Sequence, residues 1–309
     1  MATVQADQMA EFFAAVGKRT KPDLDVVTRR DVLERMHLLT SEPEAVTYAE
    51  VDAGGVPGMW CIPAGCDDDT VMMWCHAGGT VVFSMHSDRK IAGHLAKAAG
   101  VRALVLDFRH APENKFPAQQ DDVEMAYRWL LAQGYRPEKI ASCGHSIGGN
   151  LAVSLAIRQR DQGMPVPAAV LATSAWLDME LTSQVLEANA GNDKNLSVPL
   201  LQFFRECWIG GTGTGYDDPR VNLLYADLKG LPPINIYYGQ YEILAGSVVE
   251  FAGRAEAAGL DVGLHPVPAG QHLFLFGAGR VPETDAAITE MGRWLRSKLG
   301  LGLAALPVG

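Results

Sequence analysis

Strand-like and helix-like segments alternate along this chain from residue 45 onward, and this order restricts the fold more than any other feature. The expected strands cover residues 46–51, 56–62, 71–75, 102–107, 139–143, 168–173, 234–238 and 262–267, and the expected helices cover residues 88–98, 121–131, 150–160, 248–257 and 284–299. Ala53-Gly54-Gly55 separates the first two strands as a hairpin turn does. Alternating strands and helices usually form a mostly parallel sheet with helices on both faces, so we predict an α/β fold.

The N-terminal segment, residues 1–44, lies outside this alternation. Its apolar side chains recur in two stretches at the spacing of one helix face. They are Met9, Phe12, Phe13 and Val16 in the first stretch, and Val32, Leu33, Met36 and Leu39 in the second. The pattern predicts two amphipathic helices that need an apolar surface to cover.

Residues 178–216 also interrupt the alternation. They are polar and rich in glycine, with apolar side chains embedded between Leu200 and Trp208. Such a stretch favours an insertion over the edge of the sheet. We therefore predict an N-terminal helical segment over residues 1–44, a main domain over 45–300 that includes the insertion, and a C-terminal tail over 301–309.

The composition argues against several kinds of partner. The chain has 309 residues, a net charge of −10 and no apolar run that approaches the length of a membrane span. Nucleic acids and anionic membranes are bound through an excess of Lys and Arg. We therefore expect no nucleic acid partner and no integral membrane association.

The cysteines and histidines indicate a reduced compartment and no metal. The five cysteines are an odd number without metal-site spacing, and the histidines lack paired-ligand spacing such as H-E-x-x-H. Asp7 and Glu11 stand where a secretory signal would carry positive charge followed by an apolar stretch. We expect a cytoplasmic protein without a metal or other cofactor.

The sequence Gly144-His145-Ser146-Ile147-Gly148 joins an expected strand to an expected helix. On the sharp turn that glycines at both ends allow, the Ser146 Oγ is lifted out at the sheet edge, where a carbonyl carbon can reach it. In this context the motif predicts a nucleophilic serine. His145 is adjacent to Ser146 in sequence, but neighbouring side chains diverge on such a turn, so we do not expect it to be the base.

A second glycine turn, His76-Ala77-Gly78-Gly79, follows the strand at residues 71–75. Without a Cβ, Gly78 and Gly79 can bring backbone N–H groups close to a developing oxyanion, and the N–H of Ile147 joins them at a helix N-terminus. A phosphate-binding loop is the alternative, but neither of its usual glycine patterns is present. The turn is typical of an oxyanion hole.

A serine nucleophile needs a base, and the base needs an acid that fixes its tautomer. His272 follows the last expected strand and precedes the final helix, where a loop at the carboxyl edge of the sheet would place it. Glu242 follows the strand at residues 234–238 and is our expected acid. Asp261 and Asp227 are the rival acids. The order Ser146, Glu242, His272 is that of an α/β-hydrolase triad.

Four separated motifs carry a family resemblance. They are His76 to Gly79, similar to H-G-G-G; Asp107 to Glu113, similar to D-Y-R-L-A-P-E; Gly144 to Asn150, similar to G-D-S-A-G-G-N; and Gly270 to Phe274, similar to the segment around the catalytic histidine. Together they resemble the hormone-sensitive-lipase family of α/β-hydrolase esterases over residues 46–298. The chain departs from the family pattern at Ala77, His145, Ile147 and Glu242, so the resemblance does not specify the subfamily or the substrate.

The resemblance implies a nucleophile at Ser146, a base at His272, an acid at Glu242 and oxyanion donors at Gly78, Gly79 and Ile147. It implies hydrolysis of small to medium apolar esters, with lactones among the candidates, through an acyl-enzyme. The N-terminal helices and the 178–216 insertion would form a cap over the pocket. Candidate pocket residues are Phe12, Phe13, Trp176, Phe204 and Trp208.

Two further functions stay open at this point. One is a non-catalytic protein that binds a hydrophobic ligand on the same fold, and the other is hydrolysis of amides or other acyl bonds by the same residues. The N-terminal stripe has two interpretations as well. It forms a mobile lid, or it packs permanently on the core or on a second subunit of a homodimer.

Overall fold

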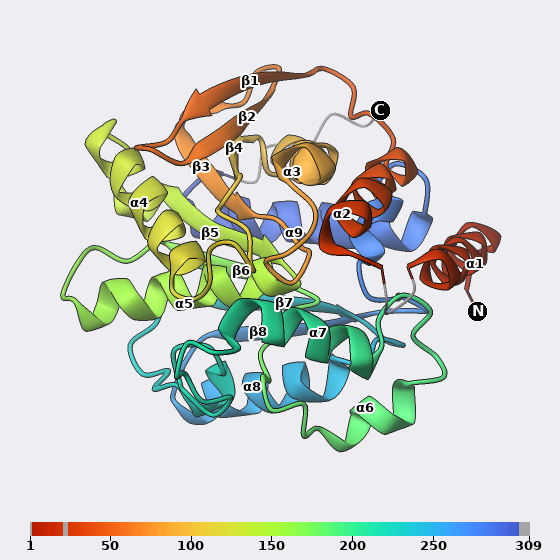
Figure 1. The fold of residues 1–309 in the computed structure, drawn as a ribbon. Helices are drawn as coiled ribbons and strands as arrows, with labels where there is room; N and C mark the ends of the chain where they lie inside the picture. The colour runs from red at the N-terminus through yellow and green to blue at the C-terminus, as the bar shows by residue number, and fades with distance from the viewer. Residues whose placement is uncertain (1, 21–23, 303–309) are drawn as a thin grey trace.

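The predicted α/β fold is confirmed in the computed structural model, which describes residues 2–20 and 24–302 (Figure 1). The strands are β1 Val46–Asp52, β2 Pro57–Pro63, β3 Asp67–Cys75, β4 Val101–Leu106, β5 Ile140–His145, β6 Ala169–Thr173, β7 Ile234–Gly239 and β8 Val262–Val267. The helices are α1 Val4–Arg19, α2 Val26–Glu34, α3 Met85–Ala99, α4 Ala118–Ala132, α5 Ile147–Asp161, α6 Gln184–Asn189, α7 Val198–Ile209, α8 Ala245–Ala257 and α9 Pro282–Lys298. From residue 303 on, the predicted tail lies outside the described residues.

The strands form one sheet in the order β1-β2-β4-β3-β5-β6-β7-β8. Only the pairs β1–β2 and β2–β4 are antiparallel; the other neighbours run parallel. Every residue of β5 and β6 is buried, as expected for strands in the middle of a parallel sheet that is covered on both faces. Because β5, β7 and β8 are parallel, the segments that follow them leave the sheet at the same edge.

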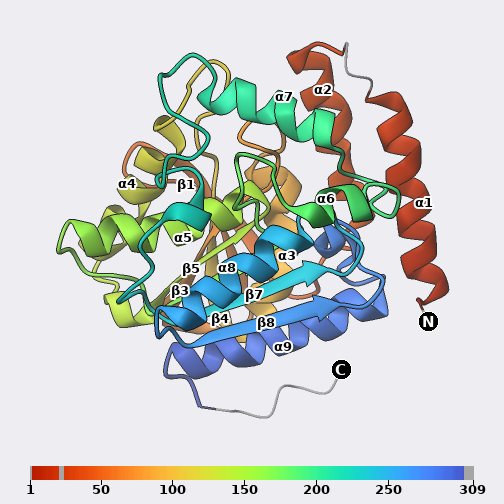
Figure 2. The same ribbon diagram turned by 90° about the horizontal axis from the view of Figure 1, so that it is seen from below.

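Helices cover both faces of the sheet. α3 and α9 pack against each other on one face, while α4, α5 and α8 lie on the other (Figures 1 and 2). α3 begins three residues earlier than the sequence predicts. The reason is a capping box, in which the Ser84 hydroxyl accepts hydrogen bonds from the N–H groups of His86 and Ser87. Among residues 2–20 and 24–302, no helix has the length and apolar character needed to cross a membrane.

Four helices lie beyond the carboxyl edge of the sheet, and we call them the covering helices. The first predicted N-terminal helix is α1, and the second predicted stretch, Val32 to Leu39, spans the end of α2 and a 3-10 helix at Arg35–Leu39. α6 and α7 come from the predicted insertion. In Figure 2, α2 and α7 lie above the sheet edge and α1 runs along its side. The α1 N-cap Thr3 donates from its N–H and its hydroxyl to Glu283 on α9, at 2.8 and 2.7 Å. The segment after α2 is tied by Thr40 Oγ1, which donates to Phe276 O at 2.9 Å.

A buried carboxyl, Asp88, supports the turn that follows β3. It accepts a hydrogen bond from Trp74 Nε1 at 3.0 Å, and the backbone of Ala77 also donates to it. Burial raises the pKa of Asp88 to about 7, although these hydrogen bonds oppose the rise. The native state therefore holds a proton on Asp88 between about pH 4 and pH 7, where the unfolded chain has released it.

We expect this carboxyl to make the protein less stable as the pH rises through that window. Asp88→Asn has no carboxyl to ionise, so the variant does not lose this stability as the pH rises. Its advantage over wild type in free energy of unfolding should grow by roughly 2–4 kcal/mol from pH 4 to pH 7 and stay constant above pH 7. Urea unfolding at several pH values measures this difference. The exposed Asp31→Asn is the matched control. A difference that does not change with pH would contradict the assignment.

Candidate active site

Ser146 stands on a strained turn between β5 and α5. Its φ of 58° and ψ of −118° are unusual for a residue with a side chain, and its side chain is almost fully buried. A Cβ on Gly148 would lie 2.1 Å from the backbone oxygen of Cys75, so only glycine lets α5 start this close to β3. The sequence Gly144 to Gly148 thus forms the sharp turn that its residues predict.

His272 lies directly beside Ser146. Its Nε2 is 3.0 Å from the Ser146 Oγ, and the ring is 3% exposed. His272 follows β8 in the chain, and the next residue, Leu273, has a φ of 66° that turns the backbone sharply. The parallel strands β5 and β8 therefore bring together two residues that are 126 positions apart.

Glu242 lies on the far side of the imidazole. Its Oε2 is 3.5 Å from His272 Nδ1, and the carboxyl is fully buried. Burial raises the pKa of Glu242, and the neighbouring His272 and the Ser174 hydroxyl act against this rise. Ser146, His272 and Glu242 thus form one chain of side chains from a hydroxyl through an imidazole to a carboxyl.

The rival acids lie elsewhere. Asp261 precedes β8, at the opposite edge of the sheet, and pairs with Lys298 Nζ at 2.6 Å. Asp227 is exposed and precedes β7. Both stand at the amino ends of strands, whereas His272 follows a carboxyl end.

Two other histidines border the site. His145 is fully buried in the turn, with its ring centroid 6.4 Å from that of His272, and burial lowers its pKa well below the ordinary value. His76 stacks on Phe108 at 4.0 Å, and its Nδ1 lies 2.6 Å from Ala77 O. Burial lowers the pKa of His76 to about 4, so both rings are neutral at neutral pH.

Gly78 and Gly79 lie beside Ser146 at the wall of the same cavity, and Ile147 is the first residue of α5. Both glycines have positive φ, 105° and 60°. A Cβ on Gly79 would lie 2.5 Å from Phe204 Cγ, which explains why no larger residue fits. The structure therefore brings the three expected oxyanion donors to the serine.

This arrangement suits attack on a carbonyl carbon. The imidazole can take the serine proton, the carboxyl can stabilise the charged ring, and N–H groups of the glycine turn and the helix end can receive negative charge. Within the part of the chain that the structure describes, no three side chains of His, Cys, Asp or Glu gather as metal ligands would.

Comparison with known proteins agrees with this geometry. A model of the α/β-hydrolase fold family matches residues 72–276. Over 253 residues the chain is 32% identical to an acetyl-hydrolase of Streptomyces hygroscopicus, with 82% of this chain and 84% of that protein covered. An esterase of Acinetobacter venetianus is 31% identical over 236 residues, with 76% and 77% covered. A crystal structure of an esterase from the bacterial hormone-sensitive lipase family superimposes with a TM-score of 0.92 at 34% identity, covering 97% of this chain and 100% of that one.

This chain belongs to the bacterial hormone-sensitive-lipase family of esterases. The predicted family and fold are thereby confirmed.

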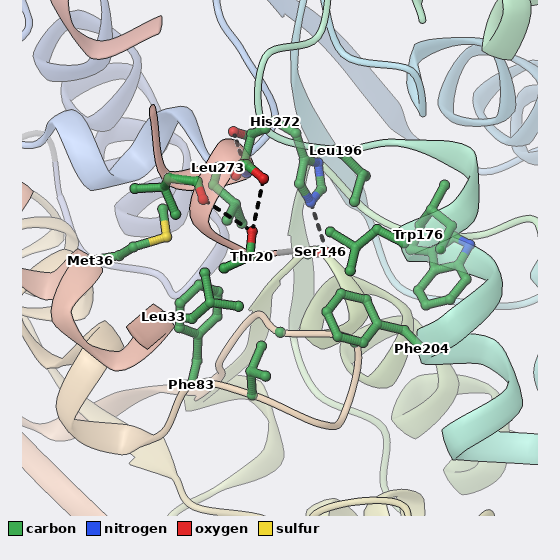
Figure 3. Close-up of a pocket in the computed structure, with 18 residues that line it drawn as sticks. Thr20, Leu33, Met36, Phe83, Ser146, Trp176, Leu196, Phe204, His272 and Leu273 are labelled. Carbon is green, nitrogen blue, oxygen red and sulfur yellow. Dashed lines mark hydrogen bonds between the residues drawn. The ribbon is translucent and has the colours of Figure 1, made fainter. Parts of the chain in front are cut away.

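The cavity of this family member opens above Ser146 and has a volume of about 550 Å³, including its mouth (Figure 3). The covering helices and the segments that follow or join them supply most of its apolar wall, and the loops after β3, β6 and β8 supply the remainder. The wall residues include Val16, Leu33, Met36, Phe83, Leu196, Leu201 and Phe204.

Two of the five candidate pocket residues, Trp176 and Phe204, line this cavity (Figure 3). The other three do not. Phe12 points outward and is 40% exposed, and Phe13 is buried against the segment that follows β8. Trp208 is fully buried and donates through Nε1 to Gln119 on α4 at 3.0 Å. Helix periodicity indicated that these faces are apolar, but the packing of α1 and α7 selected which residues reach the cavity.

Sequence reasoning missed Thr20, Asn195 and Leu196, which also line the cavity. Thr20 ends α1, and the other two lie between α6 and α7. No local pattern marks them, because loop residues acquire this role only when distant helices meet over Ser146.

Arg30 on α2 was also missed, and it holds the glycine turn. Its Nε donates to Val81 O at 2.7 Å, its Nη2 donates to Ala111 O at 2.8 Å, and it forms a fork with Glu113. The Arg30 side chain lowers the pKa of Glu113 to about 2. One guanidinium thus joins a covering helix to both motifs that flank the site.

We expect Arg30→Gln to lower kcat roughly tenfold, because releasing Val81 lets the turn with Gly78 shift away from the reacting carbonyl. Glu113→Gln is the matched control. It removes only a half-exposed ion pair and keeps both carbonyl contacts, so its kcat should stay within about threefold of wild type. Steady-state kinetics on a short aryl ester measures both. Equal losses of kcat in the two variants would show that the Arg30–Glu113 ion pair, rather than the hydrogen bonds from Arg30 to the backbone of the turn, supports the reaction.

Proposed function

We propose that this protein is a serine carboxylesterase that hydrolyses small to medium apolar esters through an acyl-enzyme. In this proposal Ser146 is the nucleophile, His272 the general base and Glu242 the acid. The observation that carries it is the 3.0 Å contact between Ser146 Oγ and His272 Nε2 at the base of an apolar cavity. The names of its relatives, an acetyl-hydrolase and an esterase, support the same class of substrate.

The proposed reaction has two halves. In the first, Ser146 Oγ bonds to the ester carbonyl carbon while His272 Nε2 takes its proton. The oxyanion accepts hydrogen bonds from the N–H groups of Gly78, Gly79 and Ile147. The C–O bond to the alcohol breaks, and the alcohol oxygen leaves with the proton from His272.

In the second half, water attacks the acyl-enzyme. His272 takes a proton from the water, the new C–O bond forms, and the bond to Ser146 Oγ breaks as the serine regains a proton. The carboxylic acid is released. Glu242 stays ionised throughout, holds Nδ1–H toward itself and stabilises the imidazolium.

Residues 1–44 and 178–216 act in this proposal as a cap that sets the size of the substrate. They supply Leu33 and Met36 from α2 and the turn after it, and Leu201 and Phe204 from α7, so the acyl and alcohol groups meet apolar side chains from both parts of the cap. An apolar wall favours short alkyl or aryl esters over charged ones. A lactone presents the same carbonyl group to Ser146, so lactones are a narrower group of candidate substrates within this class.

A fluorophosphonate and a substrate screen together test the proposal. The reagent should label one serine per chain and stop turnover, and Ser146→Ala should not be labelled. The screen compares p-nitrophenyl esters from acetate to decanoate with a γ-lactone and an anilide. We expect the highest kcat/KM on short esters. A protein that binds esters without labelling or turnover would instead be a non-catalytic binding protein, and faster cleavage of the anilide would make it an amidase.

A further inference from the structure

The segment between α6 and α7 connects the two loops that carry Glu242 and His272. Asn189 Nδ2 donates to the backbone oxygen of Glu242 at 2.9 Å. Asn195 Nδ2 donates to the backbone oxygen of His272 at 3.3 Å. Between them, the N–H of Lys194 donates to Gln271 Oε1 at 2.7 Å. We call residues 189–195 the bracket segment, because one short stretch contacts both loops.

Asp193 is the buried centre of the bracket segment, with a side chain 6% exposed. Its Oδ1 accepts the N–H groups of Asn195 and Leu196, both at 2.9 Å, which folds the segment around the carboxylate. Its Oδ2 accepts the N–H of Ile243 at 3.1 Å. Ile243 directly follows Glu242, so this bond fixes the backbone from which the acid side chain extends.

The charge of Asp193 also reaches the imidazole. Burial raises the pKa of Asp193, while His272 and the three amide donors oppose the rise. Asp193 in turn raises the pKa of Glu242, and His272 lowers it.

The acid depends on a backbone that is held in place. Glu242 Oε2 lies 3.5 Å from His272 Nδ1, so a small shift of the loop after β7 changes the distance between the carboxyl and the imidazole. The hydrogen bond from the Ile243 N–H to Asp193 Oδ2 opposes such a shift.

We propose that Asp193 is a positioning residue for the reaction: through the Ile243 amide it holds the backbone of the Glu242 loop and so keeps the acid carboxyl beside His272 Nδ1. The bracket segment also supplies Asn195 to the cavity wall, so the piece of chain that borders the substrate sets the geometry of the acid and the base. This inference rests on the proposed function.

Asp193→Asn tests it, because the amide keeps the size but loses the charge and presents a donor or a weaker acceptor to Ile243. We expect kcat to fall roughly ten- to hundredfold, with KM within about threefold of wild type. A loss in kcat with KM kept distinguishes a misplaced acid from damage to the substrate pocket. Asp227→Asn, which changes an exposed aspartate in the same way, is the matched control and should behave as wild type.

Asn189→Ala is a second test. It removes another hydrogen bond to the Glu242 backbone, so kcat should fall about threefold to tenfold while KM stays within about threefold of wild type. If Asp193→Asn does not fold, an unchanged kcat in Asn189→Ala refutes the positioning role of the bracket segment. If Asp193→Asn folds and shows wild-type kcat, the inference fails, provided that Ser146→Ala is inactive. Activity that survives in Ser146→Ala would instead remove the proposed function itself.

Discussion

Ser146→Ala is expected to lower kcat on a short aryl ester by roughly 10⁴- to 10⁶-fold, because no other group takes over the bond to the acyl carbon. His272→Ala should cost about as much. The loss in the double variant should equal that of either single one, since the hydroxyl and the imidazole, 3.0 Å apart, act as one unit. The residual rate reflects substrate binding and the oxyanion donors alone.

Single-turnover measurements at high enzyme concentration can resolve such low rates. Thermal unfolding of each variant shows whether the fold is intact, and we expect small changes because Ala fits both positions. EDTA should leave the wild-type rate unchanged. An Ser146→Ala protein that keeps more than a few per cent of the activity would refute the assignment of the nucleophile.

Glu242→Gln should lower kcat by roughly 10²- to 10⁴-fold. A glutamine has the same size but cannot neutralise the imidazolium, and its amide donor favours the wrong tautomer of His272. The effect is large because the carboxyl is fully buried, where charges interact strongly.

Asp227→Asn and Asp261→Asn are the matched controls for the acid. Both residues are exposed, and Asp261 pairs with Lys298 on the opposite edge of the sheet. Their kcat values should stay within about twofold of wild type. A large loss in either control, with Glu242→Gln still active, would move the acid to another residue. Asp193→Asn belongs in the same series. If it lowered kcat more than Glu242→Gln does, Asp193 would be the acid and Glu242 the positioning residue.

Local sequence was sufficient for the parts of the site that follow directly from strands. Ser146, Glu242 and His272 each stand just after a strand-like run, and in a parallel sheet those positions meet at one edge. The glycines of the two turns could also be predicted from local sequence. The structure shows why they are needed: a Cβ at Gly79 or Gly148 would clash with neighbouring atoms. These features depend on residues a few positions apart, which a single sequence displays.

The cavity wall was less predictable. The spacing of Phe12 and Phe13 indicated an apolar helix face, but in the structure Phe12 is partly exposed and Phe13 packs away from Ser146. The pocket instead receives Val16 and Thr20 from the same helix. Periodicity gives the face of a helix to within about 100° and does not reveal how the helix is rotated over a distant loop.

The sequence by itself determined the α/β order, the family and the chain order of the nucleophile, acid and base, because these depend on local patterns. Only the tertiary structure decided that Arg30 grips the glycine turn and that Asp193 touches the backbone beside Glu242. Both contacts join residues about 50 positions apart through single hydrogen bonds. A hydrogen bond of this kind leaves no periodic trace in a sequence, since its two partners meet only after the sheet and the covering helices have packed.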